Sequence, residues 1–262
     1  MLFRFATFRS DWWESGVINI FLFMKPLGKK AYGSIPHLLG SKLGEGDHHC
    51  HEGQHKIATE KTRDKQDFVI VQEKYDGSNV AVAKLNGQII SLTRRGYTAE
   101  SSPFEQHHFF AKWVAANFKR FNLLLEDGDR VCGEWIIQAH GLKYAIPNHL
   151  EPFIAFDYFS GKERFVFSDF VQKVERFDFQ IPRVIHTGCA CAIEAATERL
   201  FNQSLSEIRS VCDHPEGLIY RVERSKKVDF LAKFVRNDFE TGKYLTEISG
   251  QPTVWNWDIS TF

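Results

Sequence analysis

A lysine lies between two short apolar runs in the first half of the chain. Lys74 follows residues 68–71 (FVIV), and residues 80–83 (VAVA) come soon after it. Apolar runs of this length predict strands, and Asp76 and Gly77 provide a turn between them. A lysine buried at such a corner, close to other cations, has a lowered pKa and can act as a nucleophile. The same pattern also describes a surface hairpin with a solvated lysine, so the rest of the chain must decide.

Further motifs follow Lys74 along the chain. Each joins a short apolar run to a charged residue or a glycine: Arg94-Arg95-Gly96, Gly133-Glu134-Trp135, residues 153–158 (FIAFDY), 216–221 (EGLIYR) and 231–236 (LAKFVR). In order and separation, the set resembles the motifs of the covalent lysyl-nucleotidyltransferases, which are ATP-dependent RNA and DNA ligases and mRNA capping enzymes. Asn79 and the ending Lys-Phe-Val-Arg are most similar to the ATP-dependent RNA ligase family. The resemblance covers residues 34–240.

The predicted elements favour an α+β fold of two packed sheets. Strands are expected at 68–71, 80–83, 89–92, 131–137, 153–158, 217–222 and 229–235, and helices at 103–125, 167–174, 190–202 and 204–212. Ser204 and Glu207 match a capping box, whereas residues 32–62 are predicted to be loop. The resemblance implies largely antiparallel sheets flanked by helices, the nucleotidyltransferase (ATP-grasp-like) ligase core. Residues 237–262 are too few for a C-terminal OB-fold, so we expect none in this chain.

The resemblance also implies a reaction. ATP-dependent RNA ligases join 3′-OH and 5′-phosphate RNA ends through a covalent lysyl-AMP intermediate and AMP-capped RNA, with Mg²⁺ or Mn²⁺ as the metal. RNA repair is the matching process, and the partners expected are RNA with these ends and an end-healing or RNA-binding protein.

The resemblance implies roles at the phosphate end of the nucleotide for the charged residues of the motifs. Lys74 is the nucleophile, and Lys233 is a second cation at the α-phosphate. Glu134 holds the ribose, and Glu216 binds the metal. Glu73 joins the nucleotide-binding set, and Asp76 acts as a turn former with a catalytic role. A single strand-end glutamate more commonly pairs with a surface cation, which is the competing interpretation for each of these acids.

The base of the nucleotide needs a flat apolar surface. Phe156 occupies the position of the aromatic residue that stacks on adenine in the family, with Tyr158 as the alternative. Core packing competes with this role, because the chain has 24 phenylalanines. Many ligases carry Lys-x-Lys in the last motif, but Leu231 replaces the first lysine here, so Lys233 stands alone.

Other residues are expected to contact the sugar or the RNA. Strand alternation puts Arg94 and Arg95 on opposite faces, so only one can enter the site; we favour Arg95 for the nucleotide and assign Arg94 to nucleic acid. The resemblance places Asn79 where the reacting ends are oriented, and we also assign it to nucleotide binding. Lys143 and Arg236 are the remaining candidates for phosphate contacts with nucleic acid.

Composition says more about the class of protein than about its fold. The net charge is zero, with 33 basic and 33 acidic residues, so nucleic-acid binding requires a local patch. The five cysteines are irregularly spaced, which suits reduced thiols and a cytoplasmic protein. No apolar run is long enough to span a bilayer. We expect residues 1–24 to be an N-terminal extension outside the core and residues 25–262 to form a single nucleotidyltransferase domain.

Two questions remain open at this point. The cluster from His48 to His51, with Asp47 and His55, is equally compatible with a metal site and a pyrophosphate-contacting loop, and a plain polar loop is the commoner case. The alternatives to an RNA ligase are a DNA ligase, a GTP-dependent capping-type enzyme, and a non-sealing protein that binds RNA ends. Leu231 and the neutral charge keep the last alternative open.

Overall fold

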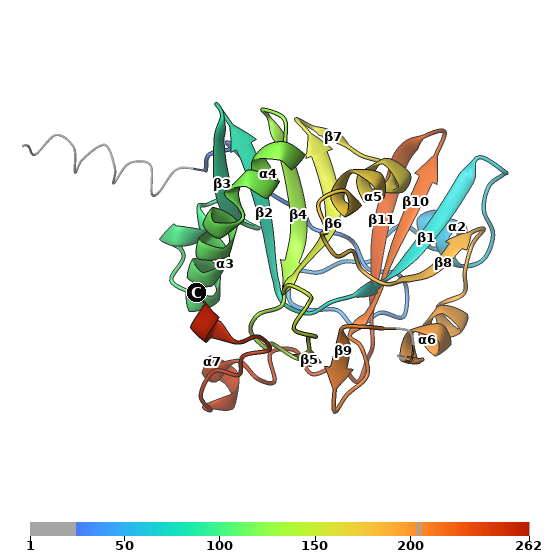
Figure 1. The fold of residues 1–262 in the computed structure, drawn as a ribbon. Helices are drawn as coiled ribbons and strands as arrows, with labels where there is room; N and C mark the ends of the chain where they lie inside the picture. The colour runs from blue at the N-terminus through green and yellow to red at the C-terminus, as the bar shows by residue number, and fades with distance from the viewer. Residues whose placement is uncertain (1–24, 203, 205, 262) are drawn as a thin grey trace, which may run out of the picture.

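Two antiparallel sheets form the centre of the molecule (Figure 1). The computed structural model describes residues 25–202, 204 and 206–261, so the predicted extension 1–24 lies outside the described residues. The four-stranded sheet has the order β11-β10-β1-β8 and consists of β1 (Asp67–Lys74), β8 (Val184–Gly188), β10 (Gly217–Arg224) and β11 (Lys227–Val235). The five-stranded sheet has the order β3-β2-β4-β6-β7 and consists of β2 (Ser78–Leu85), β3 (Gln88–Thr93), β4 (Asp129–Trp135), β6 (Phe153–Ser160) and β7 (Glu163–Arg164).

Helices cover one face of each sheet, which confirms the α+β prediction. The five-stranded sheet packs against α3 (Glu105–Ala116), α4 (Phe118–Leu124) and α5 (Phe167–Glu175), and the four-stranded sheet packs against α2 (Glu52–Thr59) and α6 (Ile193–Phe201). Aromatic residues such as Phe110, Trp113 and Trp135 fill the first of these cores. Burial of such large side chains contributes most of the stability of this layer.

Smaller elements complete the described chain. A two-stranded ribbon of β5 (Lys143–Ala145) and β9 (Arg209–Val211) lies below the two sheets, and the chain also contains the short helix α7 (Thr246–Ser249) (Figure 1). Two 3₁₀ turns span Ala99–Ser101 and Ile259–Thr261. No closed barrel occurs in the described residues. None of the helices described combines the length and the apolar composition needed to cross a bilayer.

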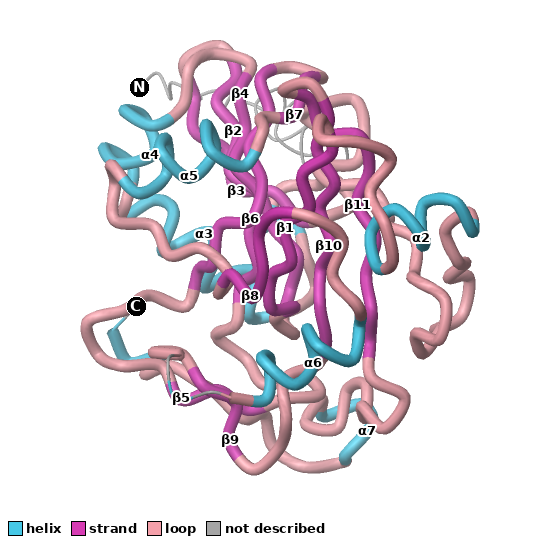
Figure 2. Tube along the Cα trace, turned by 90° about the vertical axis from the view of Figure 1, so that its right-hand side faces the viewer, coloured by secondary structure: helices cyan, strands magenta, loops and turns pink. Residues whose placement is uncertain are grey.

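The chain passes from one sheet to the other directly after Lys74. β1 ends at Lys74 and belongs to the four-stranded sheet, whereas β2 begins at Ser78 in the five-stranded sheet (Figures 1 and 2). A Cβ atom on Gly77 would lie 2.6 Å from the Trp135 carbonyl oxygen, so this corner requires glycine. Val69 and Val71 pack in the core beneath α2 and α6. Lys74 alternates with them and therefore faces the space between the sheets.

Three secondary-structure predictions need correction. The helix predicted at 204–212 is wrong, because residues 209–211 pair with β5 and the Ser204 hydroxyl donates to Asn202 Oδ1 instead of capping a helix. The predicted loop 32–62 contains α2, which is anchored by a hydrogen bond from the Cys191 amide to the Ala58 carbonyl. The helix predicted at 103–125 is two helices that meet at Asn117. In the first two cases contacts distant in sequence decide the local structure.

A candidate nucleotide site between the two sheets

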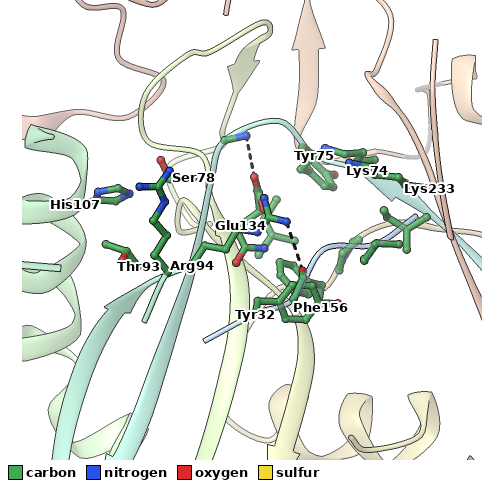
Figure 3. Close-up of a pocket in the computed structure, with 18 of the residues that line it drawn as sticks. Tyr32, Lys74, Tyr75, Ser78, Thr93, Arg94, His107, Glu134, Phe156 and Lys233 are labelled. Atoms are coloured by element: carbon green, nitrogen blue, oxygen red, sulfur yellow. Dashed lines mark hydrogen bonds between the residues drawn. The ribbon is translucent and has the colours of Figure 1, made fainter. Parts of the chain in front are cut away.

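A cavity of about 830 Å³ lies between the facing sides of the two sheets. Figure 3 shows Lys74 and Lys233 at one end, Tyr32 and Phe156 at another, and Glu134 between them. Thr93, Arg94 and His107 lie on the side of α3 (Figure 3). The cavity therefore has a cationic end and an aromatic end, which matches the two halves of a nucleotide.

Lys74 is held by a carboxylate at the cationic end. Its Nζ lies 2.6 Å from Glu216 Oε2 and 3.4 Å from the Tyr75 carbonyl oxygen. Burial lowers the pKa of Lys74, but Glu216, Glu134 and Asp76 together outweigh burial and raise it. The prediction of a lowered pKa was therefore wrong. The resemblance had placed these acids in one site with Lys74, but the sequence did not show that their charges would outweigh burial.

Two buried glutamates accompany Lys74. Burial raises the pKa of Glu216 to about 8 and that of Glu134 to about 7, although Lys74 opposes both shifts. Glu134 Oε1 accepts a hydrogen bond of 3.1 Å from the Gly77 amide (Figure 3). Strand β2 pairs with β4 so that Asn79 is opposite Glu134. The structure thus brings both predicted acids to the nucleophile.

Lys233 reaches the same cavity from β11. Its Nζ lies 3.3 Å from Asp47 Oδ1. Burial lowers the pKa of Lys233, and this effect outweighs the opposing charge of Asp47. Leu231 also lines the cavity and is 8% exposed. The position at which many ligases carry another lysine is therefore an apolar part of the wall.

Phe156 lines the aromatic end of the cavity, whereas Tyr158 does not contribute to it. The Phe156 and Tyr32 rings meet edge to face with centroids 5.0 Å apart. Tyr158 is fully buried in the core under α5, and its hydroxyl donates to Asp129. The register of β4 and β6 shifts between Cys132 and Gly133. A bulge there places Phe156 and Tyr158 on opposite faces, so the alternative assignment to Tyr158 was wrong.

Both arginines of the next motif line the cavity, and the prediction that only one could enter was wrong. β3 ends at Thr93, and Gly96 adopts a φ of +88°. Arg94 and Arg95 therefore lie in a turn, where strand alternation does not apply. Arg94 Nη2 also donates to Ser34 Oγ at 3.2 Å.

Asn79 contributes an unusual atom to the cavity. Its Oδ1 is buried and has no hydrogen-bond partner among the described residues. Such an acceptor is costly unless a donor reaches it. The cavity therefore contains a polar atom that suits a ligand hydroxyl or amino group.

The carboxylates of two predicted residues, Asp76 and Glu73, accept their hydrogen bonds from partners other than Lys74. The Asp76 carboxylate accepts from the Gly141 and Leu142 amides at 2.6 and 3.0 Å, which fixes the loop after β4. The Glu73 carboxylate, 2% exposed, pairs with Arg183 at 2.9 Å, because strand alternation turns it away from Lys74. Glu73 nevertheless lines part of the cavity, so its nucleotide-binding role stays a prediction.

Arg236 does not face nucleic acid. It is 4% exposed, and its guanidinium donates to the Pro215 carbonyl at 2.7 Å and pairs with Asp238 at 2.6 Å. The predicted RNA contact by Arg236 was wrong: the arginine supports the loop that leads into Glu216. Lys143, by contrast, is exposed on β5, away from the cavity.

A comparison with protein families identifies the part of the chain that forms this site. The RNA ligase family model matches residues 67–235. The chain belongs to the RNA ligase family. The matched region begins with β1 and ends with β11, so it contains Lys74, Glu134, Phe156, Glu216 and Lys233.

Similar solved structures include ligases of both nucleic acids. An archaeal ATP-dependent RNA ligase has 16% identity and a TM-score of 0.47, covering 78% of this chain and 48% of that one. A Naegleria gruberi RNA ligase with PPi has 16% identity and a TM-score of 0.47, with coverage of 82% and 62%. A putative ATP-dependent DNA ligase from Aquifex aeolicus has 14% identity and a TM-score of 0.44, with coverage of 78% and 49%. The chain spans about half the length of the archaeal ligase. The comparison with curated proteins found no match.

Several residues of this RNA ligase family member were missed in the sequence. Tyr32 and His37 come from the segment before β1, outside the family match. His107 lies in the first turn of α3, beside the cavity; burial lowers its pKa to about 4, and its Nδ1 lies 2.6 Å from Ser102 Oγ. Arg221, 1% exposed, pairs with Asp157 at 3.2 Å. The only sequence feature that pointed to any of these missed residues was the cluster of acids and histidines that contains Asp47.

That cluster forms no metal centre of its own. Within the described residues, no three His, Cys, Asp or Glu side chains are grouped closely enough to hold a metal ion. Asp47 accepts from His37 and Lys233, which ties the loop to β11.

Proposed function

We propose that this chain is an ATP-dependent RNA ligase that joins 3′-OH and 5′-phosphate ends through a lysyl-AMP intermediate on Lys74. One observation carries the proposal: Lys74 Nζ lies 2.6 Å from Glu216 Oε2 inside a cavity that Glu134, Phe156 and Lys233 also line. Membership of the RNA ligase family supports the same chemistry.

The first step requires an uncharged amine. Lys74 Nζ attacks the α-phosphorus of ATP, a P–N bond forms, and the bond to pyrophosphate breaks. Because the surrounding acids raise the pKa of Lys74, a proton must leave before attack. Glu216 is the nearest base, and its deprotonated form, which becomes more populated as the pH rises toward its pKa of about 8, can accept that proton. Lys233 supplies positive charge for the phosphates.

The acids also fit a divalent cation that accompanies the nucleotide. Mg²⁺ is commonly held by one or two carboxylates together with substrate phosphates and water. Glu216 and Glu134 are buried acids at raised pKa, and a nearby cation would favour their charged forms. Such an ion would neutralise charge on the phosphates. We therefore assign Glu216 as the metal ligand. Glu134 lies between the lysines and Phe156, and we assign it to the ribose, as the resemblance implies.

Two further transfers complete the reaction. The 5′-phosphate of RNA attacks the lysyl-AMP phosphorus, so that the P–N bond breaks and AMP-capped RNA forms. The 3′-OH then attacks the 5′-phosphate, and AMP leaves. Asn79, Arg94 and Arg95 line the same cavity and are the candidates to orient the reacting ends.

Incubation with α-³²P-ATP and Mg²⁺ or Mn²⁺, followed by a denaturing gel, tests the proposal. Wild type should carry label, Lys74→Ala should not, and Lys84→Ala on β2 is the matched control that should keep it. RNA and DNA nicks with 3′-OH and 5′-phosphate ends then identify the polymer. Label from GTP alone would favour a capping-type enzyme. RNA binding without any label would contradict the ligase and favour an end-binding protein.

A further inference from the structure

The segment before β1 is built onto the strand that carries Lys233. We call residues 36–50 the strap. Its backbone joins β11 through three hydrogen bonds: Lys233 N to the Pro36 carbonyl at 2.9 Å, Leu38 N to the Lys233 carbonyl at 2.8 Å, and Lys42 N to the Val235 carbonyl at 3.0 Å. The strap therefore has a defined register against the very residue that enters the cavity.

A chain of side-chain hydrogen bonds follows the same route. The Val235 amide donates to Ser41 Oγ at 2.9 Å, and Ser41 Oγ lies 2.7 Å from His37 Nδ1. His37 Nε2 lies 2.9 Å from Asp47 Oδ2, and Lys233 Nζ lies 3.3 Å from Asp47 Oδ1. The chain begins and ends on β11, two positions apart.

His37 determines the orientation of the Asp47 carboxylate. It is 2% exposed, and both of its ring nitrogens have partners. A carboxylate only accepts hydrogen bonds, so the Nε2 proton of His37 points to Asp47 and Ser41 donates to Nδ1. Burial lowers the pKa of His37, which is consistent with a neutral ring. A buried ring with both nitrogens engaged cannot turn without losing a hydrogen bond.

Lys233 needs such a partner more than an ordinary lysine does. The flexible side chain of Lys233 ends in a cavity that also contains Lys74. The two positive charges repel each other, so Lys74 lowers the pKa of Lys233. The acids that face Lys233 are Asp47 from the strap and Glu216 from the turn before β10. Glu216 is in contact with Lys74, which leaves Asp47 as the direct partner of Lys233. Leu231 offers no second cation to share the role.

We propose that Asp47, oriented by His37, is a positioning residue that holds the Lys233 ammonium in the cavity beside Lys74. This inference deepens the proposed ligase function and rests on it for the kinetic part of its test. The acid and histidine cluster thereby acquires a role other than metal binding. It compensates for the missing lysine at position 231 by restricting the one that remains.

Single-turnover formation of lysyl-AMP tests the proposal. Asp47→Asn keeps the shape and the backbone bonds of the strap but removes the charge. We expect the maximal rate to fall about tenfold with the ATP concentration at half-maximal rate changed less than about twofold. Glu45→Gln removes an exposed charge from the same strap and should leave the rate unchanged. Asp47→Glu, which restores a carboxylate, should recover most of the rate.

A double-mutant cycle separates positioning from a general effect on folding. In a Lys233→Gln background, Asp47→Asn should cause no further loss, because the side chain that it positions is gone. An equal loss in both backgrounds, or no loss from Asp47→Asn alone, would overturn the inference while leaving the ligase proposal intact. Thermal unfolding of each variant checks that the fold persists, and Asp47→Ser takes the place of Asp47→Asn if the latter unfolds.

A second readout does not depend on catalysis. Limited acetylation with acetic anhydride, read by mass spectrometry, reports how firmly Lys233 is held. Asp47→Asn should change the labelling rate of Lys233 at least about threefold and leave Lys84 unchanged. Should wild type form no lysyl-AMP, the ligase proposal fails, and this labelling still decides whether Asp47 holds Lys233.

Discussion

Lys74, at the corner between the sheets, and Lys233, on strand β11, lie in one cavity, but their surroundings shift their pKa values in opposite directions. Burial acts on both and lowers the pKa of each. Three acids surround Lys74 and raise its pKa overall, whereas Lys233 has one direct acidic partner, Asp47, and its pKa stays lowered. The number of acids that the fold brings to a lysine, more than its burial, decides the direction of the shift.

The difference suggests separate roles for the two lysines. Lys74 is paired with a base that can take its proton, which suits a nucleophile. Lys233 is paired with an acid that is itself fixed by His37, which suits a cation that stays in place. The predictions below are ordered from the largest expected effect to the smallest.

Exchanging each lysine for arginine should separate the roles most strongly. A guanidinium keeps the charge but is never deprotonated in proteins. Lys74→Arg should therefore lower lysyl-AMP formation by about a thousandfold or more. Lys233→Arg should lose about tenfold, because only the geometry of a cation changes. Single-turnover labelling with α-³²P-ATP measures both rates, and equal losses would contradict the division of roles.

The pH dependence should follow the Lys74 corner. Below the raised pKa values of Glu216, about 8, and Glu134, about 7, these acids bind protons and Lys74 keeps its own. The rate of lysyl-AMP formation should therefore rise with pH below about 8 and level off above it, and a higher concentration of the divalent cation, which favours the charged acids, should shift this rise to lower pH. Initial rates in overlapping buffers at constant ionic strength check this. A rate independent of pH over that range would rule out proton loss at the corner as a limiting step.

Phe156 sharpens the comparison, because it belongs to the aromatic end of the cavity. Phe156→Ala should raise the ATP concentration at half-maximal labelling about tenfold, since stacking of one base contributes about 1–3 kcal/mol. The maximal rate should change little, because both lysines remain in place. Phe156→Trp is the control that keeps a stacking surface. A selective loss of maximal rate would assign Phe156 to the chemistry instead of the base.

The smallest effect concerns stability. The pKa of Glu134 is raised from 4.5 to about 7 in the folded chain, so the fold binds this proton more tightly than the unfolded chain does. The stability that comes from the bound proton is complete below pH 4.5 and is lost as the pH rises through 7. Glu134→Gln should therefore stabilise the protein at pH 8 by about 1 kcal/mol, or about 3 °C, and have little effect at pH 4.5. Thermal unfolding at the two pH values measures the difference.

Much of the core follows from local pattern. Apolar runs predicted the strands that became β1, β2, β3, β4, β6, β10 and β11, and aromatic periodicity predicted the helical region of α3 and α4. The order and spacing of the motifs correctly predicted that five residues lie together: Lys74, Glu134, Phe156, Glu216 and Lys233. All of them except Glu216 line the cavity, and Glu216 contacts Lys74. The ribbon strand β9 was mistaken for a helix, because its partner β5 is distant in the sequence.

Errors at the site have a common origin in irregular backbone. The bulge beside Phe156 reversed the face of Tyr158, and the turn after Thr93 allowed both arginines into the cavity. Period-two reasoning holds only while the strand is regular. The burial of Arg236, which directly follows β11, depends on contacts with the loop before Glu216, and the residues of β11 do not reveal these contacts.

The sequence by itself determined the two-sheet α+β core, the corner at Lys74 and the types of side chain that line the cavity, because these depend on local periodicity and on glycine at the turn. Only the tertiary structure decided the protonation tendencies of the two lysines and the partnership of His37, Asp47 and Lys233. Electrostatic shifts depend on distances between groups far apart in the chain. The strap and β11 are separated by most of the molecule in sequence, and hydrogen bonds join them only after folding.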